Sequence, residues 1–490
     1  MAAEASQLHV FFFPLMAHGR IIPCIDIARQ FAARGTKSTI ITTPLNALRF
    51  ADSIDGDKQA GLDIEFQMIP FPAVEAGLPE GCESTSSLTS PAMLMNFFKA
   101  LGTLQQPFEQ LLQEHRPDCI VSDAFFPWTT NVAEKYGIQR LCLHGASYLT
   151  LCLIENIERY APHKKVTSSS EVFVVPGLPD QIELTKSQMF NGGVSDNISP
   201  STDDKLEEVD GKSFGVLMNS FQELEPDYAE YYQKEMGRRS WHIGPVSLYG
   251  RNNIYKAERG NKSSVDDHHC LSWLDSKEPN SVLYVSFGSV CRFGTSQLLE
   301  IAMGLEASHV PFIWVVKMDK NKANEQFLPE GFEKRMEGKG LIIRDWAPQV
   351  LILDHVAVGG FMTHCGWNSI LEGITSGVPL ITWPVFAEQF YNEKLVTQVL
   401  KTGISAGNKV WSPWVQVEYV SVTKDRIEAI VTQLMGNGEA AEGMRRRATA
   451  LGEKAKKSVE NGGSSYNQLT ALIEELKVHS HQTNIDKPTQ

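Results

Sequence analysis

Two runs of alternating strand-like and helix-like segments, separated by a polar stretch, constrain the fold of this 490-residue chain more than any other feature. In the first run, apolar segments at 8–13 and 38–42 are typical of buried strands, and between them lie a loop and a helical segment that Gly35 ends. This is the β–loop–α–β unit from which parallel sheets are built. Further strands of the first run are expected at 118–123, 139–143, 215–220 and 241–244.

The alternation resumes after residues 248–267, which are rich in Asn, Gly and Lys and predict an exposed linker. Two doubly wound α/β domains facing each other are therefore expected, with ligands bound in the cleft at the carboxyl ends of the strands. The strands of the second run are expected at 281–287, 312–316, 341–344, 357–362 and 378–383, and its helices at 296–305, 367–375 and 388–400. The predicted divisions are an N-terminal domain at 1–250, a linker at 251–267, a C-terminal domain at 268–464, and a last helix with a polar tail at 465–490 that packs back toward the N-terminal domain.

The composition argues against several classes of protein. A net charge of −13 is the opposite of the basic surface that nucleic-acid binding requires. The apolar run near the N-terminus is short and interrupted by Pro14, so we expect neither a signal peptide nor a membrane span. The eight cysteines are scattered without a CxxC pair, as in reduced, buried thiols. We therefore expect a cytoplasmic protein, and a monomer.

The heptapeptide THCGWNS, residues 363–369, stands where a buried strand turns into a helix. A helix N-terminus offers free N–H groups and a partial positive charge. Asn368 and Ser369 fall in the first turn and His364 precedes them, so the pattern favours a diphosphate site. A zinc site is disfavoured because His364 and Cys365 would point to opposite sides of a strand end. No base is evident that would make Cys365 a nucleophile.

The segment WAPQVLILDHVAVGGFMTHCGWNSILEGITSGVPLITWPVFAEQ, residues 346–389, resembles the signature box of plant secondary-metabolite UDP-glycosyltransferases. The resemblance extends through FFPLMAHGR, IVSDAF and SWLDSKEPNSVLYVSFGS. It implies the GT-B fold, in which two Rossmann-like domains face each other across a cleft. It also implies an enzyme that moves a sugar from a UDP-sugar to a hydroxylated acceptor with inversion at the anomeric carbon. UDP-glucose is then a co-substrate, and neither a metal nor a redox cofactor is expected.

The resemblance also implies a role for each matched residue. Trp346 would stack on uracil, and Ala347 and Gln349 would contact the base and ribose. Glu372 would accept hydrogen bonds from both ribose hydroxyls, a task that suits the two oxygens of a carboxylate. The remaining donor-site residues are Ser289, His364, Asn368 and Ser369 for the diphosphate, and Trp367, Glu388 and Gln389 for the sugar.

Two positions at the end of the box bear on the sugar. A glutamine there usually accompanies glucose in the family, so Gln389 favours UDP-glucose. The acid before it is often aspartate, and Glu388 leaves the detailed hydrogen bonds to the sugar hydroxyls open.

A histidine and an aspartate form the predicted catalytic pair. His18 follows the first strand in a loop and Asp123 ends a later strand, so both would project into the cleft. The imidazole has a suitable pKa for taking a proton from an acceptor hydroxyl. The carboxylate would fix the tautomer of the ring and stabilise the imidazolium. The family's catalytic residues match these positions, but many relatives have HGH where this chain has HGR, so Arg20 changes the local hydrogen bonding and bears on the acceptor entrance.

The acceptor pocket is expected among apolar and aromatic residues, which suit a hydrophobic, hydroxylated aglycone although each could equally belong to a core. The candidates are Leu15, Met16, Phe125, His144, Tyr148 and Phe386. We favour a triterpenoid or steroidal acceptor, with a flavonoid next. Two alternatives stay open: a catalytically silent nucleotide-sugar-binding protein, which would not need His18 and Asp123, and a UDP-sugar epimerase of the same fold, which would not need a large apolar pocket.

Two acidic clusters imitate metal sites. Asp55 and Asp57 form a DxD sequence, but the surrounding polar residues predict a turn. The aspartates of DDHHC, residues 266–270, are explained as carboxylates at a helix start. No metal site is predicted at either place.

Overall fold

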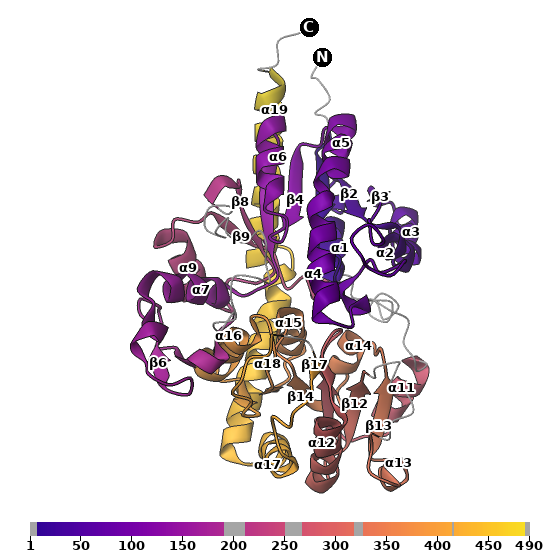
Figure 1. The fold of residues 1–490 in the computed structure, drawn as a ribbon, viewed down its shortest axis with the longest axis vertical. Coiled ribbons are helices and arrows are strands. Elements are labelled where there is room, and N and C mark those ends of the chain that lie inside the picture. Colours follow the sequence, from indigo (N-terminus) through magenta and orange to yellow (C-terminus); the bar gives the residue numbers. More distant parts are fainter. Residues whose placement is uncertain (1–6, 191–210, 250–266, 318–326, 414–415, 486–490) are drawn as a thin grey trace.

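The structure is a computed structural model that describes residues 7–190, 211–249, 267–317, 327–413 and 416–485. Two α/β bodies lie one above the other, and each is built on a parallel sheet (Figure 1). The predicted linker, residues 251–267, falls almost wholly outside the described residues.

The N-terminal sheet has seven parallel strands in the order β3-β2-β1-β4-β5-β8-β9. Its strands are β1 (His9–Phe13), β2 (Lys37–Thr42), β3 (Ile64–Met68), β4 (Cys119–Asp123), β5 (Gln139–His144), β8 (Gly215–Met218) and β9 (Ser240–His242). Strand β1, an inner strand of the sheet, is buried on both faces, because Val10 and Phe12 enter one core while Phe11 and Phe13 enter the other. Burial on both faces explains why the strand is a continuous apolar run rather than an alternating one.

Helices cover both faces of the N-terminal sheet. They are α1 (His18–Ala32), α2 (Pro44–Arg49), α3 (Ala51–Gln59), α4 (Pro91–Thr103), α5 (Gln105–His115), α6 (Trp128–Tyr136), α7 (Tyr148–Tyr160) and α9 (Pro226–Lys234). Smaller elements are the antiparallel pair β6 (Val172–Val174) and β7 (Glu183–Thr185), and the 3-10 turns η1 (Thr85–Ser87), η2 (Pro162–Lys165), η3 (Lys186–Gln188) and η4 (Val246–Leu248).

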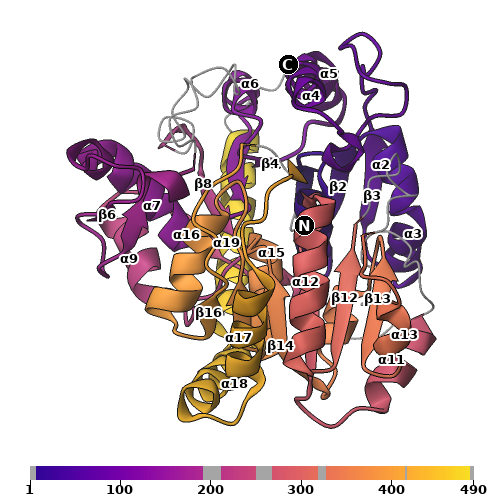
Figure 2. The same cartoon turned by 60° about the horizontal axis from the view of Figure 1, so that its bottom comes forward.

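The C-terminal sheet has six parallel strands in the order β13-β12-β10-β14-β15-β16. Its strands are β10 (Val282–Ser286), β12 (Phe312–Val316), β13 (Gly340–Arg344), β14 (Val358–Thr363), β15 (Leu380–Thr382) and β16 (Gly403–Ser405), and a separate small pair joins β11 (Arg292–Phe293) to β17 (Gln416–Val417). The helices are α11 (Asp267–Asp275), α12 (Thr295–Ser308), α13 (Phe332–Arg335), α14 (Gln349–Leu353), α15 (Trp367–Thr375), α16 (Gln389–Lys394) with the π-helical turn η6 (Leu395–Val399), α17 (Lys424–Met435) and α18 (Glu439–Val459). Helices α12 and α17 pack together on one face (Figure 2), and α14, α15 and α18 contribute to the core on the other.

The last helix, α19 (Ser464–Ile485), leaves the C-terminal body and runs along the N-terminal one (Figure 1). Its buried side chains Leu469, Leu472, Ile473 and Leu476 share a core with strand β1 and helix α1. The chain therefore joins the two bodies twice. Among the described helices, none is both long and apolar enough to cross a membrane.

The structure corrects two local predictions. The expected loop around His18 is the first turn of α1, and this helix continues through Pro23. Proline is tolerated there although it has no N–H to donate to the carbonyl of Gly19, because Asn368 of the other body donates to that oxygen at 2.6 Å. Asp57 lies in helix α3 rather than in a turn, and it pairs with the buried Arg29 at 2.5 Å. Tertiary pairing thus outweighs local turn propensity.

Candidate active site

The start of α1 lies against the C-terminal body, at the carboxyl ends of both sheets. The rings of His18 and Trp346 are 5.3 Å apart between centroids, with a tilt of 43°. The next residue, Gly19, receives the hydrogen bond from Nδ2 of Asn368. Two consecutive residues of α1 therefore touch two separate segments of the predicted donor site, which brings the predicted base to that site.

His18 is buried, with 4% of its surface exposed. Its Nε2 lies 3.4 Å from Nη1 of Arg49, a contact in which the arginine donates and the imidazole accepts. The contact therefore favours a neutral ring with its lone pair on Nε2. Arg49 occupies the Nε2 lone pair in this arrangement, so the arginine must move aside before the ring can act as a general base.

Asp123 ends β4 and is completely buried. Its Oδ1 accepts from the backbone N–H of Phe125 at 3.0 Å, and Nη1 of Arg20 forms an ion pair with Oδ2 at 3.7 Å. Within the part of the chain that the structure describes, Oδ2 takes part in no hydrogen bond. The hydrogen bond between this carboxylate and His18 thus stays a prediction, and the ion pair with Arg20 is a feature that the sequence did not predict.

Arg20 occupies the space between the ends of β4 and β5. Its guanidinium lies 5.4 Å from the centroid of the Phe125 ring, and a Cβ at position 145 would come within 2.3 Å of it. A side chain at 145 would therefore require the Arg20 guanidinium to move. Burial raises the pKa of the Glu388 carboxyl, and the charge of Arg20 acts in the opposite direction. The residue that departs from the HGH pattern is thus placed between Asp123 and a predicted sugar-binding carboxylate.

His364 is held rigidly at the junction of β14 and α15. A Cβ at Gly288 would lie 2.4 Å from its ring, and a Cβ at Gly366 would lie 2.6 Å from it. The next residue, Cys365, has the left-handed φ of 67°, which is rare outside glycine and often marks functional sites. Burial lowers the pKa of His364 to about 4, so the ring is neutral near pH 7 and can donate one N–H to an anion.

The other predicted diphosphate residues surround this histidine in sequence and structure. Asn368 and Ser369 lie in the first turn of α15, where the free N–H groups of the helix are found. Ser289 follows β10, and its carbonyl accepts a hydrogen bond from Lys317. Burial, and then the neighbouring charge of Arg292, lower the pKa of this lysine to about 8. Sequence reasoning missed Lys317, although its place directly after a buried strand is the signal that marks it.

The predicted uridine residues form one polar cluster beside Trp346. Nε2 of Gln349 donates to Oε2 of Glu372 at 2.7 Å and to Oγ of Ser369 at 3.2 Å. Ala347 is buried. Trp346 and Gln349, on either side of it in the sequence, are half-buried. The structure therefore brings the carboxylate predicted for the ribose and a serine predicted for the diphosphate within reach of the same amide.

The two other sugar-site residues are held by main-chain contacts. The indole of Trp367 is buried, and its Nε1 donates to the carbonyl of Asn219 in the N-terminal body at 2.8 Å. A sugar contact from this residue must therefore come from its main chain. The side-chain oxygen of Gln389 accepts from the N–H groups of Val385 and Phe386 at 2.9 and 3.0 Å. Its NH₂ group is left to donate to a sugar hydroxyl.

Three acceptor candidates lie in the hydrophobic cores of the N-terminal body. Leu15 and Met16 pack in a hydrophobic core. Tyr148 is 1% exposed, its ring packs edge-on against Tyr232, and its hydroxyl and that of Ser240 are 3.1 Å apart. The structure thus places the Tyr148 ring in a core and not at a surface open to a ligand.

The remaining acceptor candidates lie at or near the boundary between the bodies. Phe125 is 43% exposed and its ring stacks on Phe98 at 5.9 Å. Phe386 lies 6.4 Å from the ring of His364. His144 ends β5 and is buried, with its Nε2 3.5 Å from Sγ of Cys142. Phe125 and Phe386 are therefore the best placed of the six to meet an acceptor.

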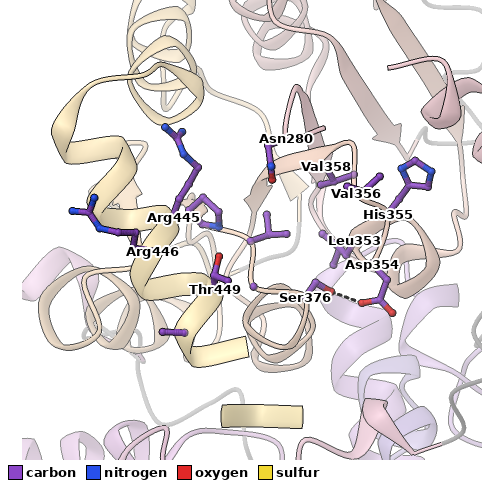
Figure 3. Close-up of a pocket in the computed structure, with 14 residues that line it drawn as sticks. Asn280, Leu353, Asp354, His355, Val356, Val358, Ser376, Arg445, Arg446 and Thr449 are labelled. Atoms are coloured by element: carbon purple, nitrogen blue, oxygen red, sulfur yellow. Dashed lines mark hydrogen bonds between the residues drawn. The ribbon is translucent and has the colours of Figure 1, made fainter. Parts of the chain in front are cut away.

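A separate surface pocket of about 550 Å³ lies at the amino ends of the C-terminal strands (Figure 3). Asn280, Val358 and Pro379 line it together with Arg445 and Arg446 of α18. It is therefore on the edge of the sheet opposite to His364. Over the described ranges, no three His, Cys, Asp or Glu side chains are grouped as a metal site would require.

Comparisons with known proteins agree with this geometry. Residues 202–409 match the family described as UDP-glucoronosyl and UDP-glucosyl transferase. The chain is 53% identical to a scopoletin glucosyltransferase of Nicotiana tabacum, over 97% of this chain and 99% of that protein. It belongs to this family of UDP-dependent glycosyltransferases. A UDP-glucose flavonoid 3-O-glucosyltransferase of Fragaria ananassa is 51% identical over 96% of this chain and 97% of that protein.

The fold of this glycosyltransferase is GT-B, as predicted from the resemblance. The crystal structure of Glycyrrhiza uralensis UGT73P12 with glycyrrhetinic acid 3-O-monoglucuronide superimposes with a TM-score of 0.92. The two chains are 42% identical, and the match covers 98% of each.

We expect Trp346→Ala to raise the KM for the UDP-sugar by about 10-fold or more, because stacking of a base on an aromatic ring contributes about 1–3 kcal/mol. The kcat should fall less than the KM rises, and any fall in kcat reflects the loss of the contact between Trp346 and the His18 ring. Initial rates at varied donor concentration measure both constants. Trp346→Phe keeps a flat ring, so its KM for the UDP-sugar should lie between those of the wild-type protein and Trp346→Ala. A drop in kcat without a rise in KM would contradict a role in uracil binding.

Proposed function

We propose that this enzyme transfers glucose from UDP-glucose to a hydroxyl group of a hydrophobic plant secondary metabolite, with inversion and without a metal ion. The observation that carries the proposal is the contact of the α1 start with the donor site, through His18 with Trp346 and Gly19 with Asn368. The contact brings a buried imidazole next to a helix N-terminus suited to a diphosphate.

In the proposed reaction His18 takes the proton of the acceptor hydroxyl, and Asp123 stabilises the imidazolium that forms. The acceptor oxygen attacks the anomeric carbon from the face opposite UDP. A new C–O bond forms while the bond between the anomeric carbon and the phosphate oxygen breaks, and the electron pair leaves with UDP. The N-terminus of α15 and the neutral His364 stabilise the negative charge of the departing diphosphate.

For the acceptor, we infer a phenolic hydroxyl first and a triterpenoid second, which reverses the order favoured from the sequence alone. Relatives named for scopoletin and for flavonoids are 53% and 51% identical to this chain. The structure crystallised with a triterpenoid glucuronide is 42% identical. The exposed aromatic ring of Phe125, next to Arg20, suits a planar aromatic acceptor.

The test incubates the purified protein with UDP-glucose and EDTA in the presence of phenolic, triterpenoid and steroidal aglycones, followed by mass spectrometry and NMR. A gain of one hexose in the β configuration supports the proposal, because the donor is α-linked. An α-glucoside would exclude inversion, and activity lost with EDTA would exclude metal independence. A silent binding protein would give UDP-glucose binding without product, and an epimerase would alter the sugar in the absence of any aglycone.

A further inference from the structure

Asn392 lies within α16, completely buried between the two bodies. Its Oδ1 accepts from Oγ1 of Thr150 at 2.9 Å and from Oγ of Ser147 at 3.4 Å, both at the start of α7 in the N-terminal body. Its Nδ2 donates to the carbonyl of Cys365 at 3.0 Å and to Oε1 of Glu388 at 3.3 Å. The Ser147 hydroxyl has one hydrogen and also lies 2.9 Å from Oγ1 of Thr150, so Thr150 supplies the main bond to Oδ1. The amide thus turns its oxygen toward one domain and donates both N–H groups to the other.

The two groups that receive these N–H bonds are parts of the donor site. Cys365 is the left-handed residue that joins His364 to the first turn of α15. Glu388 is the carboxylate predicted to accept from the sugar. Its burial raises its pKa, and the Asn392 amide and the charge of Arg20 favour the ionised form. An ionised carboxylate is the form that accepts hydrogen bonds from two hydroxyls.

The partners on the other side are equally well placed. Ser147 is the N-cap of α7, and its Oγ also accepts from the N–H of Thr150 at 3.0 Å. The first two N–H groups of the same helix, those of Tyr148 and Leu149, are fixed by the buried carboxylate of Glu225 at 3.0 Å each. The hydroxyls that contact Asn392 therefore lie in the first turn of α7, which hydrogen bonds from Ser147 and Glu225 fix in place.

We propose that Asn392 is a positioning residue for the donor sugar: it fixes Glu388 and the Cys365 carbonyl relative to α7, so that the sugar subsite is complete only when the two domains are docked. The inference rests on the proposed binding of UDP-glucose at this site. The part of this role that is selective for the sugar is the bond to Glu388, because neither the uracil stack on Trp346 nor the predicted diphosphate contacts use that carboxylate. A residue that only held the domains together would affect UDP and UDP-glucose equally.

The test compares the affinity for UDP-glucose with that for UDP, measured by titration calorimetry on the full chain. Asn392→Asp keeps the size and the two acceptor bonds but sets a carboxylate against Glu388 and a carbonyl. We expect its Kd for UDP-glucose to rise by about 10-fold or more, because two buried acceptors lose their donor. Its Kd for UDP should rise by less than about 3-fold, because UDP senses only the Cys365 side. Asn156→Asp is the matched control, because Asn156 is equally buried but bonds Pro176 and Tyr231 in the N-terminal body. It should change neither affinity.

Two further results would overturn the proposal. One is an equal loss of affinity for both ligands in Asn392→Asp. The other is additivity of Asn392→Ala and Glu388→Gln in a double-mutant cycle on UDP-glucose binding, because coupled residues give a non-additive result. Thr150→Val removes one hydrogen bond on the α7 side and keeps the Asn392 amide. It should also lower the affinity for UDP-glucose more than that for UDP, but by less than Asn392→Asp does. If wild-type protein binds UDP-glucose but glucosylates nothing, the proposed function fails while the role of Asn392 is still tested by binding.

Discussion

Replacing His18 by alanine is expected to lower kcat by about 10²–10⁴-fold, the usual contribution of a general base. The imidazole is buried at the start of α1, its Nε2 lies 3.4 Å from Arg49, and its ring faces Trp346. Removal of the ring takes away the group that receives the acceptor proton. It leaves the diphosphate residues in place, so the KM for UDP-glucose should change by less than about 5-fold, a modest effect beside that of the lost base.

The measurement is steady-state kinetics with the acceptor found in the product screen. Phenols of different acidity sharpen it, because a more acidic phenol depends less on a base and should lose less rate in the variant. His242→Ala is a suitable control, since His242 is buried at the end of β9 and is not among the predicted site residues. A His18→Ala enzyme with near-normal kcat on weakly acidic alcohols would show that another group takes the proton.

Much of the fold was predictable because parallel strands buried on both faces form continuous apolar runs. The run containing Phe11, Phe12 and Phe13 is one example, and β12 and α15 have the same bounds as predicted from the sequence. Predictions failed where a distant partner decides the local structure. The first turn of α1 forms ahead of Pro23, which cannot donate to the carbonyl of Gly19. That carbonyl instead accepts a hydrogen bond from Asn368, 349 positions further along the chain. No local pattern reveals such a contact.

The residues of the candidate site also fall into two groups, those marked by local sequence and those placed by distant partners. Residues with a predicted role that a compact motif carries, such as His364 and Asn368, could be nominated from the heptapeptide and the helix that follows it. Asn392 could not, because its role depends on what the fold brings near it. Lys317 had one signal in the sequence, its place directly after a buried strand. The pairing of Arg20 with Asp123 was equally hidden, although the unusual HGR sequence marked this position as one to examine.

Gly288 should be nearly irreplaceable for donor binding, for two separate reasons. Its φ of +76° lies in the left-handed region, where a side chain costs about 1–2 kcal/mol. A Cβ at this position would also lie 2.4 Å from Cε1 and 2.5 Å from Nε2 of His364. The imidazole has little room to yield, because on another side it is so close to Gly366 that a Cβ there would overlap it too. Either the ring or the loop that carries Ser289 must therefore move.

We expect Gly288→Ala to lower kcat/KM for UDP-glucose by about 10²-fold, because the displaced His364 ring or Ser289 loop no longer hydrogen-bonds the diphosphate. Gly35→Ala separates the two effects, because Gly35 has a similar φ of +81° but no atom within 4 Å of the added Cβ. Both variants should unfold at a lower Tm, and only Gly288→Ala should lose affinity for UDP in calorimetry. Equal losses in the two variants would show that backbone strain alone accounts for the effect, and UDP affinity retained in Gly288→Ala would remove His364 from the diphosphate site.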